Sequence, residues 1–300
     1  MSERTTTPGG LSAFPITPAD EAGRVDVFAL RALVARLCAA KVDSIGLLGS
    51  TGSYAYLSRA ERRHALDAAL DAANGGTPVV AGVGALRTDE AMALASDARD
   101  AGASAGLLAP VSYTPLTDDE VFEHYRAVAG VGLPISVYDN PGTTHFAFSR
   151  ALLARLSHVD GIVAAKCPAG SPDETAAHLA ALREKAADGF SIGYSGDWNA
   201  AEAMIAGADA WYSVLAGLFP EPCLAIVRAA QRGDAEEARR LNAMLEPVWS
   251  VFRELSSLRV IYAQANAMGL ARHAPPRPIL PLRAEARSRV AEAFEAAGLA

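Results

Sequence analysis

Cysteine is scarce in this 300-residue chain, with three residues that are widely spaced and form no CxxC pair. An odd number of isolated cysteines excludes a disulfide framework, and we therefore expect a reduced, cytoplasmic protein. The polar beginning, MSERTTTPGG, lacks the apolar core of a signal peptide. No run approaches about 18 uncharged apolar residues, so we expect no membrane partner.

An excess of positive charge is also missing. The chain has 34 acidic and 27 basic residues and a net charge of −7. Nucleic-acid binders usually show a basic surface, so we expect no nucleic-acid partner. With 51% hydrophobic and 20% charged residues, the composition is that of an ordinary globular protein.

Metal-ligand and cofactor motifs are absent from the sequence. The six histidines form no HxH or HExxH pattern, and there is no GxSxG or P-loop. The sequence GVGALR at 82–87 follows an apolar run but lacks the third glycine of a dinucleotide fingerprint. We therefore expect neither a metal nor a diffusible cofactor.

Short apolar runs alternate with alanine-rich helical segments through the first 220 residues. The predicted strands are 11–16, 44–49, 78–83, 105–109, 134–139, 161–166, 190–194 and 210–214. The predicted helices between them include 27–40, 58–73, 88–101, 118–131 and 149–156, with Ser58, Thr88 and Thr117 as expected N-caps. Continuously apolar strands indicate a parallel sheet buried on both faces. Eight such repeats predict an α/β protein with a (β/α)8 TIM barrel over 1–220, with a doubly wound sheet as the alternative.

The remaining residues, 221–300, carry helical patterns and no convincing strand. Helices are expected at 234–245, 248–269 and 285–297. This pattern predicts a C-terminal helical domain, which more often covers a face or builds an oligomer contact than performs chemistry.

Lysine is rare, because only three of the 27 basic residues are lysines and the others are arginines. One of them, Lys166, ends the sixth predicted strand, GIVAAK, at the barrel end where catalytic groups gather. Lysine can lose its proton and act as a nucleophile, whereas arginine cannot. The alternative interpretation is a side chain that extends to solvent or pairs with a carboxylate.

Three further groups of residues lie at the ends of predicted strands. Tyr138 ends the fifth strand, so its phenol can share a pocket with Lys166 and shuttle protons, or it can simply pack there. The GSTG loop at 49–52 offers hydroxyls and backbone N–H groups to a carboxylate. The segment YSGDW at 194–198 is expected to be a loop that faces the substrate.

Together these motifs resemble the dihydrodipicolinate synthase/N-acetylneuraminate lyase family of pyruvate-dependent class I aldolases. The resemblance covers most of the chain. It rests on AFPITP at 13–18, GSTG at 49–52, YDNP at 138–141, Lys166, SGD at 195–197 and WYSV at 211–214.

The resemblance implies roles for individual residues. Lys166 matches the Schiff-base lysine, and Tyr138 matches the tyrosine that relays protons and orients the keto acid. Ser50 and Thr51 match the pair that holds the pyruvate carboxylate, with Thr51 also in the hydroxyl relay. Tyr212 matches a position whose backbone carbonyl faces the site.

The resemblance also implies an assembly, a homotetramer built as a dimer of dimers. Tyr113 resembles a tyrosine that acts in the neighbouring subunit's site, although the register can also place Ser112 there.

The sequence differs from the synthases of the family at positions that are expected to lie near the second substrate. Thr143 stands where they carry an arginine that binds that substrate's carboxylate, and threonine cannot form such a bidentate clamp. Ser53 replaces a frequent glutamate, and Cys167-Pro168 follows the lysine. With Gly196 and Trp198 near the acceptor side, we expect Thr143 to help select a different second substrate.

We therefore expect a Schiff-base-forming lyase, an aldolase acting on pyruvate or a hydroxylated, sugar-derived 2-keto acid, and not the synthase itself. One alternative is a hydro-lyase or deaminase that uses the same imine. Others are a catalytically silent keto-acid sensor and a phosphate-binding barrel.

Overall fold

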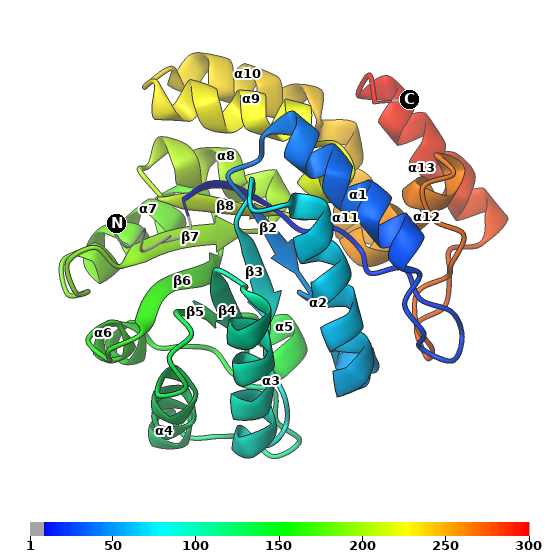
Figure 1. Cartoon of the computed structure of the whole chain (residues 1–300). Helices are drawn as coiled ribbons and strands as arrows, with labels where there is room; N and C mark the ends of the chain where they lie inside the picture. Colours follow the sequence, from blue (N-terminus) through cyan, green and yellow to red (C-terminus); the bar gives the residue numbers. More distant parts are fainter. Residues whose placement is uncertain (1–8, 300) are drawn as a thin grey trace.

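The structure, a computed structural model, describes residues 9–299 and contains a closed barrel of eight parallel strands. Most of the polar N-terminal segment considered above lies outside the described residues. The strands follow one another around the barrel in chain order (Figure 1). They are β1 (Gly10–Ala13), β2 (Ser44–Leu47), β3 (Val79–Gly82), β4 (Ala105–Leu108), β5 (Ile135–Tyr138), β6 (Ile162–Pro168), β7 (Ser191–Ser195) and β8 (Ala210–Ser213). The (β/α)8 prediction is therefore confirmed.

The strands are buried almost throughout, which explains their uninterrupted apolar runs. Outer helices follow the strands and cover the barrel (Figure 1). They are α1 (Val27–Ala40), α2 (Arg59–Ala73), α3 (Thr88–Ala101), α4 (Asp118–Ala129), α6 (Arg150–Ser157), α7 (Pro172–Arg183) and α8 (Asp197–Ile205). Two short helical turns, η1 (Tyr54–Tyr56) and α5 (Pro141–Thr144), lie in the loops after β2 and β5.

Two of the three expected helix caps are present. Ser58 accepts a hydrogen bond from the Glu61 backbone N–H at 3.2 Å, and Thr117 forms a reciprocal capping box with Glu120. The third expectation is wrong, because Thr88 is the first residue of α3 and does not cap it. Its hydroxyl instead contacts Nδ1 of His124 at 2.9 Å.

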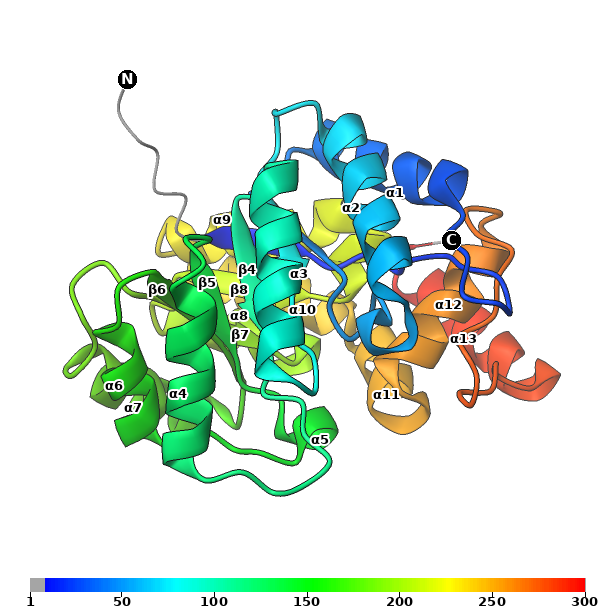
Figure 2. The same ribbon diagram turned by 60° about the horizontal axis from the view of Figure 1, so that its bottom comes forward.

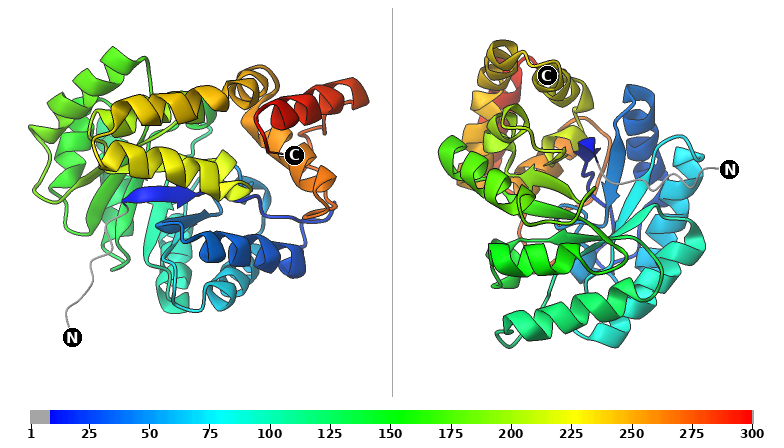
Figure 3. Two further views of the ribbon diagram at one scale, coloured as in Figure 1. Left: turned by 90° about the horizontal axis from the view of Figure 1, so that it is seen from above. Right: turned by 90° about the vertical axis from the view of Figure 1, so that its left-hand side faces the viewer.

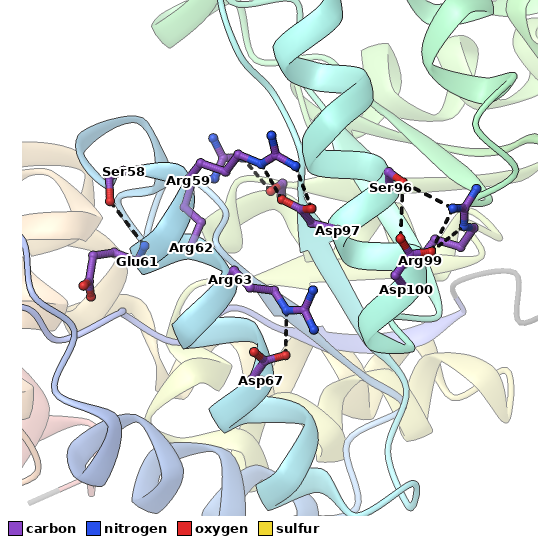
Figure 4. Close-up of polar contacts among 11 residues, drawn as sticks. Ser58, Arg59, Glu61, Arg62, Arg63, Asp67, Ser96, Asp97, Arg99 and Asp100 are labelled. Carbon is purple, nitrogen blue, oxygen red and sulfur yellow. Dashed lines mark hydrogen bonds and ion pairs between the residues drawn. The ribbon is translucent and has the colours of Figure 1, made fainter.

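Charged side chains connect the outer helices on the surface. Figure 4 shows Arg59 of α2 reaching Asp97 of α3 with two hydrogen bonds, of 2.6 and 2.8 Å. On α2 itself, Arg63 pairs with Asp67 one turn later at 2.8 Å. Exposed pairs of this kind contribute about 0–1 kcal/mol each, so the apolar barrel, not these contacts, determines the fold.

An eighth long helix, α9 (Pro220–Gln231), packs against β1 and α8 and completes the cover of the barrel. The helices α10 (Ala235–Met244), α11 (Glu246–Leu255), α12 (Ser257–Ala267) and α13 (Ala284–Ala296) follow it. In Figures 2 and 3 the orange and red helices gather at one side of the barrel. The division into 1–220 and 221–300 stays a prediction, and α9, which begins at Pro220, packs against the barrel although most of it lies beyond that boundary.

The expected single helix over 248–269 is wrong. Two helices, α11 and α12, meet at Ser256, whose φ of 72° is left-handed and rare for a residue with a side chain. No glycine or proline marks this break, so the sequence pattern runs through it.

None of the helices within residues 9–299 is both long and apolar enough to cross a membrane.

Candidate active site

A cavity of about 550 Å³ opens at the ends of the strands and extends to the junction of α11 and α12. Most of the residues singled out from the sequence line it together: Ser50, Thr51, Tyr138, Thr143, Lys166, Gly196, Trp198 and Tyr212. The remaining lining side chains are mainly aromatic, aliphatic or hydroxylic. Such a concave, partly apolar site with few convergent polar groups is the usual form of a small-molecule site.

Lys166 lies at the floor of this cavity and is 5% exposed. Its Nζ is 3.9 Å from the ring centroid of Tyr138, to which it is paired in register across β5 and β6. Rings of Phe14 and Tyr212 lie 5.6 and 5.9 Å away. No hydrogen bond or ion pair joins the amine to any residue of 9–299, which leaves it available to a ligand.

The Tyr138 hydroxyl is held by two polar side chains. It contacts the Ser50 hydroxyl at 3.1 Å, and Asn140 Nδ2 donates to it at 2.9 Å. Asn140 also donates to Ser50 at 3.2 Å, which closes a triangle of three polar groups. The network fixes the position of the phenol oxygen, while the ring of Tyr138 faces the lysine amine.

This network changes two sequence expectations. Ser50, and not Thr51, is the hydroxyl that contacts the phenol, although Thr51 also lines the cavity. Asn140 was missed, because the Asn-Pro-Gly segment looked like a turn signal only. Its position two residues after Tyr138, just before α5, was the available clue.

The loop after β2 takes its shape from small residues. The ring of Phe14 lies over Gly46 and Gly49, where an added Cβ would come within 2.2 and 2.6 Å of it. Between these two glycines the chain turns at Leu48, which has a φ of 56°. Ser50 and Thr51, which follow the turn, line the cavity.

Tyr212 of β8 is buried inside the barrel and packs edge-on against Phe14, with 6.0 Å between centroids. Burial raises the pKa of its phenol, with the Ser136 side chain acting in the opposite direction. This phenol therefore keeps its proton at neutral pH, and it belongs to the barrel interior.

The acceptor side of the cavity contains the other expected residues. Thr143 is exposed at the rim, where its hydroxyl donates to the Asn140 carbonyl at 3.3 Å. Gly196, with a φ of 96°, is the N-cap residue directly before α8, so Trp198 lies on the first turn of a helix and not in a loop.

Buried Asp197, beside Trp198, connects α8 to the end of β8. One of its oxygens accepts from Trp211 Nε1 at 3.1 Å and from the Val214 N–H at 3.2 Å. The other accepts from Ser213 and from the Leu215 N–H. Its carboxylate is thus occupied by the protein and positions the strand end.

Tyr113 does not line this cavity and is 97% exposed. The Ser112 hydroxyl, the other candidate in that loop, donates to the Thr114 carbonyl. Neither side chain reaches Lys166 within one chain.

Residues suited to a metal are dispersed. In the part of the chain that the structure describes, no three His, Cys, Asp or Glu side chains gather at one point. His178 contacts Tyr194 at 2.8 Å, and His273 contacts Asp26 at 3.1 Å, on different sides of the barrel.

Asp139, directly after Tyr138, is 7% exposed, and burial raises its pKa to about 6. The Phe148 N–H and the charge of Lys166 oppose this rise. Because the folded-state pKa exceeds the value of about 3.9 for an unfolded chain, the folded protein binds this proton more tightly. We expect this contribution to stability to be complete below about pH 4 and lost as the pH rises through about 6, a loss of about 3 kcal/mol.

Asp139→Asn provides the measurement for this prediction. The variant keeps an oxygen for the Phe148 N–H but cannot ionise, so the difference in urea unfolding free energy between variant and parent should grow from pH 4.5 to 7.5. A difference that stays constant over this range would contradict the prediction.

Comparison with known proteins gives a consistent result. The sequence profile of the Dihydrodipicolinate synthetase family matches residues 7–297. A 4-hydroxy-tetrahydrodipicolinate synthase of Saccharophagus degradans is 34% identical over 286 residues, covering 95% of this chain and 97% of that protein. A synthase of the same name from Methylococcus capsulatus is also 34% identical, covering 94% and 96%.

Solved structures show the same relationship. A dihydrodipicolinate synthase from Agrobacterium tumefaciens superposes with a TM-score of 0.96 at 57% identity, covering 99% of both chains. The chloride-inhibited dihydrodipicolinate synthase from Acinetobacter baumannii, in complex with pyruvate, gives 0.90 at 30% identity, covering 98% of this chain and 100% of that one. The chain therefore belongs to the Dihydrodipicolinate synthetase family of pyruvate-dependent lyases.

Proposed function

We propose that this protein is a lyase that forms an imine between Lys166 and pyruvate or a longer 2-oxo acid. The observation that carries this proposal is the buried, unpaired amine 3.9 Å from the ring of Tyr138 in an open cavity. The complex of the Acinetobacter enzyme with pyruvate supports the choice of a 2-oxo acid.

In this mechanism the neutral Lys166 amine adds to the C2 carbonyl and gives a carbinolamine. The Tyr138 phenol delivers the proton with which the C2 hydroxyl leaves as water. The protonated imine then accepts the electron pair released when C3 loses a proton or when the C3–C4 bond breaks. Addition of water to the imine at the end returns the keto acid and the free lysine.

Ser50 and Thr51 have separate tasks in this proposal. Ser50 orients the Tyr138 phenol, together with Asn140. Thr51, with the backbone N–H groups of its glycine-flanked loop, binds the substrate carboxylate and fixes C2 over the amine. Tyr212 closes the other wall of the cavity.

Exchange of the C3 protons of pyruvate into deuterated water tests this function without a second substrate. We expect exchange with the parent protein and none with Lys166→Met. Binding of pyruvate without exchange would contradict a lyase and support a keto-acid sensor.

We further propose that the second reactant differs from that of the synthases named among the relatives. Thr143 at the rim supplies no cation, and its hydroxyl is engaged with Asn140. The names of the relatives, at 34% identity and, for the Agrobacterium structure, 57%, count against this part of the proposal. We expect formation of 4-hydroxy-tetrahydrodipicolinate to be at least about 100-fold slower than with the Saccharophagus enzyme, because a lost charged clamp of about 2–3 kcal/mol corresponds to this factor.

The assay compares the two proteins side by side with pyruvate and the aldehyde substrate of the synthase. Equal rates would mean that this chain is itself such a synthase. Analysis of products from longer 2-oxo acids separates aldol cleavage, which gives pyruvate and an aldehyde, from loss of water or ammonia, which keeps the carbon chain.

We propose a homotetramer in which Tyr113 acts at a neighbouring subunit's cavity. Its 97% exposure in a single chain supports a position at an interface. Sedimentation velocity of the parent and of Tyr113→Ala tests the assembly, and a parent protein that sediments as a monomer would contradict it.

A further inference from the structure

Arg259 stands at the mouth of the cavity whose floor is Lys166. Three of the lining residues carry ionisable charge: Lys166, Asp197 and Arg259. The Asp197 carboxylate already accepts four hydrogen bonds from its own chain, two on each oxygen. Among the described residues that line the cavity, Arg259 is therefore a guanidinium with no free carboxylate facing it.

Arg259 is half-buried and has no hydrogen bond or ion pair with any residue of 9–299. Its neighbours on the same group of helices are paired, since Arg253 bonds to Glu246 and Arg289 to Glu254. Glu285 lines a second hollow together with Arg259 but forms no ion pair with it. A guanidinium left unpaired at a cavity wall is ready for a carboxylate, which it binds with two parallel hydrogen bonds.

The fold holds Arg259 in this place. Tyr262, one turn later on the same face of α12, donates to the Thr17 carbonyl at 3.3 Å and contacts Ser53 at 3.5 Å. These contacts fix α12 against the loops at the end of the barrel. The break at Ser256 then brings Ser256 and Ser257 into the lining beside Arg259.

The electrostatics of this helix end also favour an anion. Arg259 is the third residue of α12, so its charge is added to the positive end of the helix dipole. The first turn contains no acidic residue, and no side chain caps it. A bound carboxylate would compensate both the dipole and the guanidinium.

We propose that Arg259, assisted by the hydroxyls of Ser256 and Ser257, binds a carboxylate at the far end of the substrate. The preferred substrates are then 2-oxo diacids, with the 2-oxo acid end at Lys166 and the second carboxylate at the cavity mouth. This inference rests on the proposed imine function. It also gives a physical reason for the change at Thr143, because the cation is supplied from α12 and not from the loop after β5.

Borohydride trapping at Lys166 measures this preference. The probes are two diacids, 2-oxoglutarate and 2-oxoadipate, and the monoacids 2-oxopentanoate and 2-oxohexanoate, which end in a methyl group instead. Pyruvate is the common reference. For each probe the concentration that gives half-maximal trapping is determined with the parent protein and with the variants Arg259→Gln, Arg259→Lys and Arg283→Gln.

For at least one diacid, half-maximal trapping by the parent protein should occur at a concentration at least about 10-fold lower than for the matched monoacid. Arg259→Gln should raise the half-maximal trapping concentration of the diacids by about 10- to 100-fold and leave the values for pyruvate and the monoacids unchanged. Arg259→Lys should restore part of the preference, since it keeps the charge. Arg283 is exposed and lines the second hollow only, so Arg283→Gln should behave like the parent.

Two results would overturn the inference and leave the imine function intact. In the first, the parent protein shows no preference for diacids over monoacids. In the second, Arg259→Gln weakens the trapping of pyruvate and of diacids equally. Failure of the parent protein to trap pyruvate at all would overturn the proposed function, and the inference with it.

Discussion

Replacing Lys166 with methionine should reduce turnover by at least about 10⁴-fold, equivalent to about 5.5 kcal/mol of transition-state stabilisation. The variant removes the only amine among the described residues that line the cavity, and it keeps a side chain of similar length. Because no imine can form, the loss should appear in kcat and in C3 proton exchange alike. Steady-state turnover of the best 2-oxo acid measures the effect.

Lys185→Met is the matched control for this experiment. Lys185 is exposed at the end of α7, away from the cavity, so its replacement should leave turnover unchanged. If Lys166→Met kept a tenth of the parent activity, a covalent lysine intermediate could not be the route.

Removal of the Tyr138 hydroxyl should have the second-largest effect. In Tyr138→Phe the ring stays beside Lys166, but the proton carrier and its contacts with Ser50 and Asn140 are lost. We expect kcat to fall by about 10²–10⁴-fold, the usual contribution of a positioned acid–base group. Imine formation should still occur, so borohydride trapping should become slower without being abolished.

A pair of alanine variants separates the tasks of the two neighbouring hydroxyls. Ser50→Ala removes one partner of the phenol and should lower kcat by about 10-fold, the value of one hydrogen bond of about 1.4 kcal/mol. Thr51→Ala should instead raise the KM for pyruvate, because Thr51 is assigned to the carboxylate. If Thr51→Ala lowered kcat and Ser50→Ala raised the KM instead, Thr51 would belong to the hydroxyl relay, as the sequence resemblance implied.

The barrel was predictable because its signals are local and repeated. Strands buried on both faces leave continuous apolar runs, and each helix between them has its own periodicity. The pairing of Tyr138 with Lys166 followed from the same pattern, since both residues end adjacent strands of one closed sheet.

The features that were not predicted depend on contacts between distant segments. The break at Ser256 carries no glycine or proline, and the backbone there is fixed by the packing of α11 and α12. Arg259 lies three residues after that break and lines the cavity. Asn140 gains its significance from a hydrogen bond to Ser50, 90 residues earlier in the chain.

The packing of α9 against the barrel could not be predicted from the sequence for a similar reason. Its apolar face has ordinary helical spacing, and the sequence does not distinguish a helix that covers β1 from one that belongs to a C-terminal domain. Closure of the barrel between β8 and β1 decides this, and closure is a property of the whole sheet.

The most direct test of the account is mass spectrometry of the protein reduced with borohydride in the presence of pyruvate. The account predicts that one peptide, the one containing Lys166, gains the mass of pyruvate less one water plus two hydrogens, and that Lys166→Met gains nothing. A label on Lys41 or Lys185, or an unlabelled parent protein that still exchanges the C3 protons of pyruvate, would contradict it.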